Sequence, residues 1–571
     1  MTATAVRPRS RWLLSNAPDA ATVAALREAL HLPDLLCRLL AARGYGDPDA
    51  AKRFLRPRLE DLHAPATLRD LDRAVERIMR AINDREMILI HGDYDVDGIC
   101  STTILTRTLR WLGASVTPFI PQRVRDGYDL TAAGVSAARD AGATLVITCD
   151  CGTSACAPVA ELQAGGIDVI ISDHHLPGGP LPDAFAILNP RRPGCESPDK
   201  DLCAAGVAYK LARALTDAMG ASPNPVLNML DLVALATIAD VAPLRGENRV
   251  FAHFGLRLLN KTKSAGLRAM VRAAGLDQKP ITAGRVGFIL APRLNAAGRI
   301  GSALRGVELL LTTEESVANP IARELEELNA RRQELDRQVL DQAREMVRAL
   351  DLDRTYGIVL AGEGWHPGVI GIVASRIVEE FGRPTILIAL DGHEGKGSGR
   401  SISPFDLHAG IDRCRGLLLR FGGHRSAAGV TIARDRVADF TRCFNDVAME
   451  TLTPDDLVPE LRADLEVELQ DVTETLEALF RHVEPCGMGN PAPVMVARGV
   501  RIAAPPRTVG KDGLRVVLEQ NGTQLTALGW GMAPRAAELS VGATVDVAFR
   551  LERDEWNGAS RLQARLADFR S

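Results

Sequence analysis

The segment MILIHGDYDVDG (87–98) joins a short apolar run to a group of closely spaced acidic residues. Similar apolar runs follow along the chain, separated by helix-length segments: SVTPFIP (115–121), TLVITCD (144–150) and IDVIISDHH (167–175). Short, nearly continuous apolar runs that alternate with helices are typical of a parallel β-sheet with helices on both faces. This part of the sequence therefore predicts an α/β fold built on a parallel sheet.

Carboxylates and imidazoles stand where the predicted strands end. They follow the first, third and fourth runs, and they are His91, Asp93, Asp95 and Asp97, then Asp150, then Asp173, His174 and His175. A helix cap or an Asx turn explains a single acid at such a position. Acids and histidines after three different strands are harder to explain in this way. In a parallel sheet, ligands bind outside the carboxyl ends of the strands, so these residues would meet at one edge. We therefore predict a metal site there.

The donor set favours Mg²⁺ or Mn²⁺, because carboxylates outnumber imidazoles. A zinc site would call for thiolates or more histidines. Cys149 and Cys151 flank Asp150, and strand side chains alternate between faces, so we expect both cysteines to point away from the site and pack in the core. Several carboxylates in one place repel one another. Two divalent ions would hold them together, as in enzymes that catalyse phosphoryl displacement.

A further acidic candidate ends the apolar, helical segment 231–240. By itself Asp240 would be read as a residue at the end of a helix, and Asp231 is equally well explained as a helix N-cap.

The composition excludes several classes of protein. The chain has 571 residues, of which 46% are hydrophobic and 25% charged, as in ordinary globular proteins of three to five domains. No apolar run approaches the length of a membrane span, and no secretory signal is evident. A net charge of −4 neither supports nor excludes a nucleic-acid partner. Ten cysteines without a CxxC pair predict reduced thiols in a cytoplasmic protein.

Five parts are expected along the chain: a helical lead-in (1–45), the parallel-sheet domain (46–312), a connecting helix (313–352), a second, smaller α/β domain (353–458) and a C-terminal β domain (459–571). The segment 320–350 has one apolar stripe and no glycine. It is either a surface or coiled-coil helix, or a spacer between two compact bodies. Near the C-terminus, alternating segments predict antiparallel strands, and Asn557-Gly558 predicts a hairpin turn.

Four motifs, HGDYDVDG, TCDCGT, SDHH and ATIADVAPL, resemble those of the DHH phosphoesterase superfamily. Further segments are similar to the RecJ family of bacterial single-strand-specific 5′→3′ DNA exonucleases: APRLNAAGRIGSA (291–303), GEGWHPGVIGIVASRI (362–377), GKGSGRSIS (395–403), GGHRSAAG (422–429) and EPCGMGNPAP (484–493). The resemblance runs from about residue 45 to the end. It implies a DHH catalytic domain, a DHHA1 substrate-binding domain at 353–458 and an OB-like barrel at 459–571.

The resemblance also implies which residues bind metal and act in catalysis. One ion would be held by His91, Asp95 and Asp150, and the second by Asp97, Asp150, His174 and Asp240. His175 would face the scissile phosphate. Asp93 and Asp173 would support the ligands through hydrogen bonds. The catalytic set is then Asp95, Asp97, Asp150, His174, His175 and Asp240, with two Mn²⁺ or Mg²⁺ ions as cofactors.

Substrate-binding candidates follow from the same resemblance. They are His175 again, Arg123, Arg299, Ser398, Arg400, Gly422, Gly423 and His424, with Arg293 as a weaker choice. The GKGSGRSIS segment is expected to be a glycine-rich loop whose N–H groups approach phosphate. Any single arginine is equally explained as a solvated surface group, and His424 as a turn histidine. Trp530 and Trp556 would stack bases or pack in the core. Two residues depart from the family pattern, Asp129 from glycine and Cys486 from an aromatic residue.

The expected function is therefore a 5′→3′ exonuclease on single-stranded DNA, active in recombination and mismatch repair. The expected partners are single-stranded DNA, a single-strand-binding protein and a DNA helicase, and the chain is expected to be a monomer. Two alternatives remain open. One is a DHH phosphoesterase that acts on short oligoribonucleotides or a cyclic dinucleotide, and the other is a DNA-binding accessory factor without catalysis.

Overall fold

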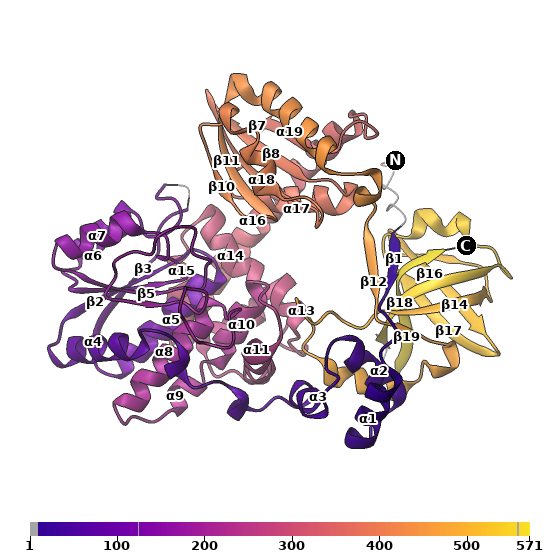
Figure 1. The fold of residues 1–571 in the computed structure, drawn as a ribbon, viewed down its shortest axis with the longest axis horizontal. Helices are drawn as coiled ribbons and strands as arrows, with labels where there is room; N and C mark the ends of the chain where they lie inside the picture. Colours follow the sequence, from indigo (N-terminus) through magenta and orange to yellow (C-terminus); the bar gives the residue numbers. More distant parts are fainter. Residues whose placement is uncertain (1–9, 124, 557–558, 571) are drawn as a thin grey trace. The chain divides into compact units, whose positions relative to one another are not determined.

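The structure is a computed structural model that describes residues 10–123, 125–556 and 559–570 (Figure 1). The chain forms two compact units. The central unit comprises Arg53–Arg332 and Glu484–Pro491, and the flanking unit comprises Met1–Lys52, Gln333–Val483 and Ala492–Ser571. No described helix is long and apolar enough to cross a membrane.

The central unit contains a five-stranded sheet in the order β3-β2-β4-β5-β6, and all neighbouring strands are parallel. Its strands are β2 (Met87–Gly92), β3 (Ser115–Phe119), β4 (Leu145–Cys149), β5 (Asp168–Ser172) and β6 (Ala186–Leu188). The predicted strands and the α/β class are thus confirmed. The short strand β6 was not anticipated.

Helices cover both faces of this sheet because successive strand residues point to opposite sides. Ile88, Ile90 and Ile147 share one core cluster with residues of α4 (Leu71–Asn83), α5 (Val96–Trp111) and α8 (Ala204–Ala218). Leu89 and Val146 share another with residues of α6 (Ala132–Asp140) and α7 (Cys156–Ala164). The sheet is therefore buried on both sides, and its carboxyl edge remains for function.

The rest of the central unit is helical, as expected. Its helices are α9 (Asn224–Leu227), α10 (Leu230–Ala239), α11 (Gly246–Leu259), α12 (Ala265–Ala273), α13 (Ala283–Arg285), a π-turn (Val286–Leu290), α14 (Ala291–Ile300) and α15 (Leu304–Leu311). The segment 484–491, predicted within the C-terminal β domain, belongs to this unit. The N–H of Leu244 donates to the carbonyl of Met488 at 2.8 Å, and Arg249 donates to the carbonyl of Glu484 at 3.0 Å.

The long helix α16 (Glu315–Arg348) is continuous, as predicted. Ala318 and Leu325 belong to the core of the central unit, whereas Val339 and Ala343 belong to a core cluster of the flanking unit. Of the two interpretations of this segment, the structure favours the spacer.

The flanking unit contains a five-stranded mixed sheet in the order β10-β11-β9-β8-β7. The strands are β7 (Ile358–Glu363), β8 (Thr385–Asp391), β9 (Glu394–Arg400), β10 (Arg420–Gly423) and β11 (Ala427–Ala433). α17 (Ile370–Phe381) packs on one face, and α18 (Leu407–Asp412) and α19 (Val437–Thr451) pack on the other. The prediction of a glycine-rich loop at GKGSGRSIS is wrong, because most of this segment forms β9, paired on both sides.

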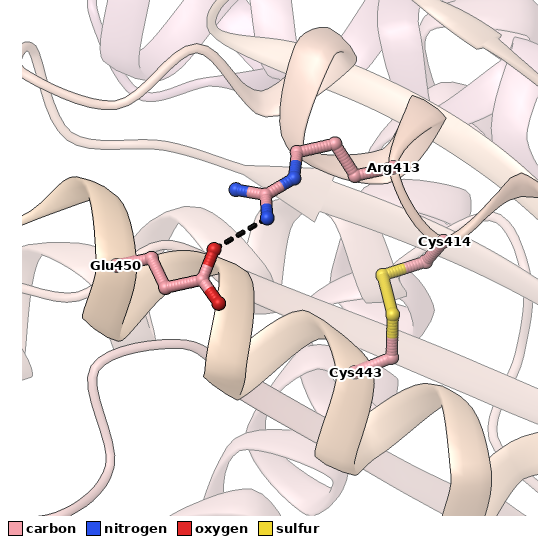
Figure 2. Close-up of a disulfide and its surroundings, with 4 residues drawn as sticks. All are labelled: Arg413, Cys414, Cys443 and Glu450. Atoms are coloured by element: carbon pink, nitrogen blue, oxygen red, sulfur yellow. Dashed lines mark hydrogen bonds and ion pairs between the residues drawn. A yellow bond between two sulfur atoms is a disulfide. The ribbon is translucent and has the colours of Figure 1, made fainter.

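Cys414 and Cys443 form a disulfide between the segment after α18 and helix α19, and Arg413 forms an ion pair with Glu450 beside it (Figure 2). The prediction that the cysteines are reduced thiols is therefore wrong for this pair.

The C-terminal region is a seven-stranded sheet in the order β13-β14-β18-β19-β17-β16-β15, and an additional β14–β16 pairing closes it into a barrel, as an OB-like domain requires. Its strands are β13 (Leu465–Glu466), β14 (Met495–Ile502), β15 (Arg507–Val509), β16 (Gly513–Gln520), β17 (Thr523–Gly529), β18 (Thr544–Trp556) and β19 (Ala559–Arg570), and α20 (Glu474–Phe480) lies between β13 and β14 in the chain. The predicted turn at Asn557-Gly558 and the side chain of Trp556 lie outside the described residues.

The N-terminal segment contains the predicted helices, α1 (Ala20–Leu30), α2 (Asp34–Ala42) and α3 (Pro48–Leu55), and also a strand that was not predicted. This strand, β1 (Arg11–Leu14), pairs in parallel with β12 (Glu460–Ala463). Trp12 donates from Nε1 to Asp568 at 2.8 Å, and Arg43 donates to Asp464 at 2.9 Å. The lead-in is thus held against the C-terminal region.

Candidate metal centre

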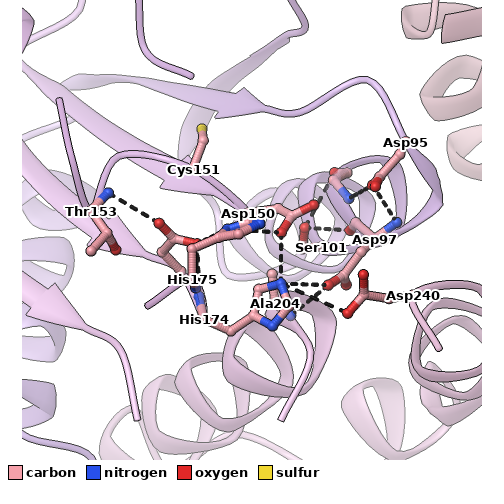
Figure 3. Close-up of polar contacts among 12 residues, drawn as sticks. Asp95, Asp97, Ser101, Asp150, Cys151, Thr153, His174, His175, Ala204 and Asp240 are labelled. Atoms are coloured by element: carbon pink, nitrogen blue, oxygen red, sulfur yellow. Dashed lines mark hydrogen bonds and ion pairs between the residues drawn. The ribbon is translucent and has the colours of Figure 1, made fainter. Parts of the chain in front are cut away.

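The acidic and imidazole side chains meet at the carboxyl edge of the parallel sheet, as the strand order requires. The loop after β2 carries Asp93 and Asp95, Asp97 lies in the first turn of α5, Asp150 directly follows β4, and His174 lies in the loop after β5. The three strands are neighbours in the sheet. Figure 3 shows the side chains of Asp97, Asp150, His174 and Asp240 converging from separate segments.

Three of the predicted ligands surround an imidazole nitrogen of a fourth. His174 Nε2 lies 3.1 Å from Asp150 Oδ1, 3.7 Å from Asp97 Oδ2 and 3.8 Å from Asp240 Oδ2. Asp240 reaches this point because it caps the carboxyl end of α10. The oxygens of Asp97 also accept hydrogen bonds from the N–H groups of Ala204 and Ala205 at 2.7 Å, which fixes the carboxylate against the start of α8.

A second group consists of Asp93, Asp95 and Asp150, which place one oxygen each within 4.8 Å of the others. Asp95 caps α5, because its Oδ1 accepts the N–H of Asp97 at 2.9 Å and that of Gly98 at 3.1 Å. Its other oxygen remains for a ligand. Asp150 belongs to this group, and its Oδ1 also lies 3.1 Å from His174 Nε2, so its carboxylate lies beside both sets of ligand atoms.

His91 is the predicted ligand that the structure does not bring into either group of the described residues. Its imidazole is buried between Phe119, at 5.4 Å between ring centroids, and Gly134, and its Nδ1 lies 3.5 Å from Cys151 Sγ. Cys151 is buried as expected, but it contacts this imidazole instead of serving only as core packing. Asp93, which was expected only to support the ligands, is the residue that lies beside Asp95 and Asp150.

The carboxylates of the two groups lie close together, and their ionised forms would be stabilised by bound cations. Burial raises the pKa of Asp97 to about 7, with a further contribution from the charge of Asp95, and burial together with Asp97 does the same for Asp240. Burial and the neighbouring acids raise the pKa values of Asp93 and Asp150 as well. Carboxylates this close cannot all be ionised without positive charge between them.

The unpaired atoms in the centre also fit metal binding. His174 Nε2, Asp150 Oδ1 and Asp93 Oδ1 are buried and form no hydrogen bond within the described ranges, although the first two face each other at 3.1 Å. Burial lowers the pKa of His174, which favours the neutral imidazole that metals bind. Leaving such atoms unpaired costs free energy. Carboxylate oxygens with one imidazole are a donor set that fits Mn²⁺ or Mg²⁺.

His175 is held by Asp173 at the mouth of the centre. Its Nδ1 lies 2.8 Å from Asp173 Oδ1, and Asp173 also accepts the N–H groups of His174 at 2.7 Å and Thr153 at 3.0 Å. Burial opposes a charge on His175, but the hydrogen bond and the charge of Asp173 outweigh it and raise its pKa to about 9. The imidazole is 40% exposed, so a protonated His175 can contact an anionic group that enters the centre.

Tyr128 is a residue of this centre that the sequence reasoning missed. Its hydroxyl lies 3.2 Å from His175 Nε2, and the residue is 47% exposed. The only available signal was its place in PQRVRDGY, beside the candidate Arg123.

The predicted arginines of the central unit lie around the loop that carries Asp93. The guanidinium of Arg123 stacks over the ring of Tyr94, 4.8 Å from its centroid. Arg299, in the last turn of α14, is close enough for its charge to act on Tyr94 as well. Arg293, by contrast, is engaged in an ion pair with Glu326 at 2.5 Å.

The other substrate-binding candidates lie on adjacent strands of the flanking unit. Ser398 of β9 pairs with Gly429 of β11, which pairs with Gly422 of β10. Arg400 donates to Ser398 Oγ at 3.2 Å. Gly423 has a φ of 141°, a conformation that favours glycine, and the N–H of His424 donates to the carbonyl of Ala427 at 2.8 Å. Trp530 of the barrel is 44% exposed.

Three family models match the chain. They are the DHH family N-terminal domain at residues 87–237, the DHHA1 domain at 354–450 and the RecJ OB domain at 463–568. These matches lie in the three regions that the sequence motifs indicated.

Relatives cover nearly the whole chain. It is 37% identical over 563 residues to the single-stranded-DNA-specific exonuclease RecJ of Bacillus subtilis, which spans 98% of this chain and 71% of that protein. The crystal structure of Thermus thermophilus RecJ in complex with Mn²⁺ is similar with a TM-score of 0.85 at 33% identity, over 99% of this chain and 80% of that one. The complex with Mg²⁺ gives a TM-score of 0.79 at 31% identity, over 99% and 79%. The chain therefore belongs to the RecJ family of single-stranded-DNA-specific exonucleases.

Proposed function

We propose that this chain is a metal-dependent exonuclease that removes nucleotides from the 5′ end of single-stranded DNA. The observation that carries the proposal is the position of Asp150, which lies within 4.8 Å of Asp93 and Asp95 and 3.1 Å from His174, so that one carboxylate would serve both ions of a two-metal phosphodiesterase. The metal-bound relatives support Mn²⁺ or Mg²⁺ as the cofactor.

Two ligand sets follow from the contacts. Asp93, Asp95 and Asp150 would hold one ion, and the second would be held by the four residues around His174 Nε2, namely Asp97, Asp150, His174 and Asp240. When bound, the ions would activate a water molecule for attack on phosphorus and neutralise the charge that develops on the phosphoryl oxygens. His91 remains a proposed ligand of the first ion, because its Nε2 is buried without a hydrogen-bond partner among the described residues, while its Nδ1 lies 3.5 Å from Cys151 Sγ.

The chain's own residues contribute orientation and charge. Asp173 keeps His175 protonated and fixes its ring, so that Nε2 can donate a hydrogen bond to a phosphoryl oxygen. The N–H groups at the start of α8 hold Asp97, and the N–H groups at the start of α5 hold Asp95. Carboxylates that are positioned before substrate binds need no reorganisation during the reaction.

The substrate contacts form two groups in the proposal. Arg123 and Arg299, together with His175, would contact phosphates near the metal centre. Ser398, Arg400 and the Gly422-Gly423-His424 segment would bind the nucleotide backbone from the flanking unit. The barrel would follow the single strand, as OB-folds commonly do.

The biological setting belongs to the same proposal. The chain would act as a monomer in the cytoplasm, in recombination and mismatch repair. A helicase would unwind the duplex, and a single-strand-binding protein would deliver the strand.

The test compares Asp150→Ala with the unchanged chain on long single strands labelled at either end, in Mn²⁺. We expect nucleotide release from the 5′ end and its loss in Asp150→Ala, with DNA binding retained. Asp183→Ala is the matched control, since Asp183 is an exposed acid of the same unit. Cleavage of a dinucleotide alone would favour the small-substrate phosphoesterase, and equal activity in Asp150→Ala would exclude the catalytic assignment.

A further inference from the structure

A second cluster of ligand-type side chains lies in the central unit, outside the metal centre. His63 stands between the short helices η1 (Leu59–Asp61) and η2 (Pro65–Thr67), Asp199 precedes α8, and Glu247 lies in the first turn of α11. One ligand atom of each lies within 4.8 Å of the others. We propose that these three residues bind a divalent transition-metal ion, Zn²⁺ in preference to Mn²⁺, that serves a structural role. This proposal does not depend on the proposed nuclease activity.

Glu247 provides the independent sign of a ligand. Its side chain is fully buried. Oε1 accepts the N–H of His63 at 2.9 Å and the ammonium of Lys210 at 2.7 Å, whereas Oε2 is buried without a hydrogen-bond partner in the part of the chain that the structure describes. A buried carboxylate oxygen left unpaired is costly. A cation bound at Oε2 removes that cost.

The charges leave room for such a cation. Lys210 offsets the charge of Glu247 from the Oε1 side, and it also donates to the carbonyl of His63 at 2.9 Å. Asp199 Oδ2 accepts the N–H of Glu247 at 2.6 Å and lies 3.8 Å from His63 Nε2, so a second carboxylate faces the same point.

The site is open to solvent on one side. The side chain of His63 is 40% exposed, so its Nε2 can be reached by an ion. A cavity of about 160 Å³ adjoins His63 and Glu247, and its wall also includes Lys210, Arg213 and apolar side chains such as Leu62 and Phe251. It can hold the water molecules that complete a coordination shell around three protein ligands.

The donor set selects the class of ion. One imidazole and two carboxylates suit Zn²⁺ and Mn²⁺, whereas Mg²⁺ prefers oxygen alone. Zn²⁺ binds more tightly than Mn²⁺ to a given set of such ligands. The ion would join three segments that lie far apart in the sequence, and it would stabilise the central unit by the free energy of binding.

The experiment uses the full chain with Asp150→Asn, a substitution that weakens the binding of both ions at the proposed catalytic centre. The chain is stripped with a chelator and equilibrated with limiting Zn²⁺. Bound zinc per chain is measured by mass spectrometry of the elements, and the melting temperature is measured in parallel. His63→Ala is added in one variant and Asp199→Asn in another. The matched control adds His253→Ala, a histidine of α11 outside the cluster.

We expect His63→Ala and Asp199→Asn each to lose about one zinc per chain and the zinc-dependent rise in melting temperature, while His253→Ala keeps both. Co²⁺ provides a second measurement, since its visible absorption should change with His63→Ala and not with His253→Ala. Equal zinc content and an equal rise in melting temperature in all variants would overturn the proposal. An equal loss in the His253→Ala control would do so too, because the binding would then not depend on this cluster.

Discussion

Asp173 Oδ1 lies 2.8 Å from His175 Nδ1, and the same carboxylate accepts the N–H groups of His174 and Thr153. Asp173 is only 1% exposed, so its position is set by the fold and in turn sets the ring of His175. We therefore propose that Asp173, the aspartate of the SDHH motif, acts through its neighbour and not as a ligand of its own. This relationship gives the first prediction.

Asp173→Asn should lower kcat about 10- to 100-fold, the usual cost of losing a group that orients a catalytic side chain. An amide carries no charge, so it would hold His175 less firmly and would not favour its protonated form. KM for single-stranded DNA should change little, because the arginines that surround Tyr94 are untouched. Steady-state kinetics on a long single strand check this. An unchanged kcat would show that His175 needs no support from Asp173.

The backbone of the HGDYDVDG loop has no room for a larger residue at Gly98. A Cβ atom there would overlap the carbonyl oxygen of Asp93, and it would lie 2.6 Å from both its carbonyl carbon and its nitrogen. Gly98→Ala should therefore displace Asp93 and weaken Mn²⁺ binding at least about tenfold, by analogy with other changes that disturb ligand orientation. Mn²⁺ titration followed by electron paramagnetic resonance measures the affinity. Gly178→Ala, where a Cβ meets nothing within 4 Å, is the control and should bind as the unchanged chain does.

The disulfide of the flanking unit predicts sensitivity to reductant. Cys414 and Cys443 are 29 residues apart, and closing a loop of this length stabilises a fold by about 3–4 kcal/mol in the chain-entropy model. Cys414→Ser/Cys443→Ser should lower the melting temperature measured without reductant. Dithiothreitol should lower that of the unchanged chain but not that of the variant. If reductant has no effect on the unchanged chain, the two thiols are reduced in the purified protein, as the sequence alone had suggested.

The carboxyl edge of the sheet could be predicted from sequence because apolar runs locate parallel strands, and parallel strands bring their ends together. Asp97, Asp150, His174 and Asp240 follow from that argument and from the family motifs, and the structure brings them to one imidazole nitrogen. This argument does not show whether His91 or Asp93 lies beside Asp95 and Asp150. Both stand near the end of one strand. In the structure Asp93 lies within 4.8 Å of Asp95 and Asp150, whereas His91 packs against Phe119 and Cys151.

Long-range pairing accounts for most of what the sequence did not reveal. The strand β9 contains three glycines, which weaken a strand signal, and it forms only because β8 and β11 pair with it on both sides. The strand β1 depends on a partner more than 400 residues away. Asp129 has a φ of 74°, where glycine is favoured, and its Oδ1 compensates by accepting the N–H of Gly152 at 2.6 Å. The spacing of residues along the sequence does not reveal these strand pairings and hydrogen bonds.

Asp231, the acid at the start of α10, should make the chain less stable at alkaline pH. Burial raises its pKa to about 6, although Thr262 donates to it at 3.1 Å and the N–H of Leu232 at 2.8 Å. The unfolded chain has a pKa near 4 for aspartate, so the folded state binds more protons between about pH 4 and 6. Stability therefore falls as the pH rises through this window, and the full cost is present above it.

Asp231→Asn removes that cost, because an amide needs no proton and can keep both hydrogen bonds. The variant should be more stable than the unchanged chain by about 1–3 kcal/mol at pH 8, and the difference should shrink toward zero at pH 4. Urea denaturation at the two pH values measures it. Asp277→Asn, a change at an exposed acid of the same unit, should show no such pH-dependent difference. A variant that is less stable than the unchanged chain at pH 8 would mean that the charged carboxylate, through Arg107 and the backbone, stabilises α10 more than burial destabilises it.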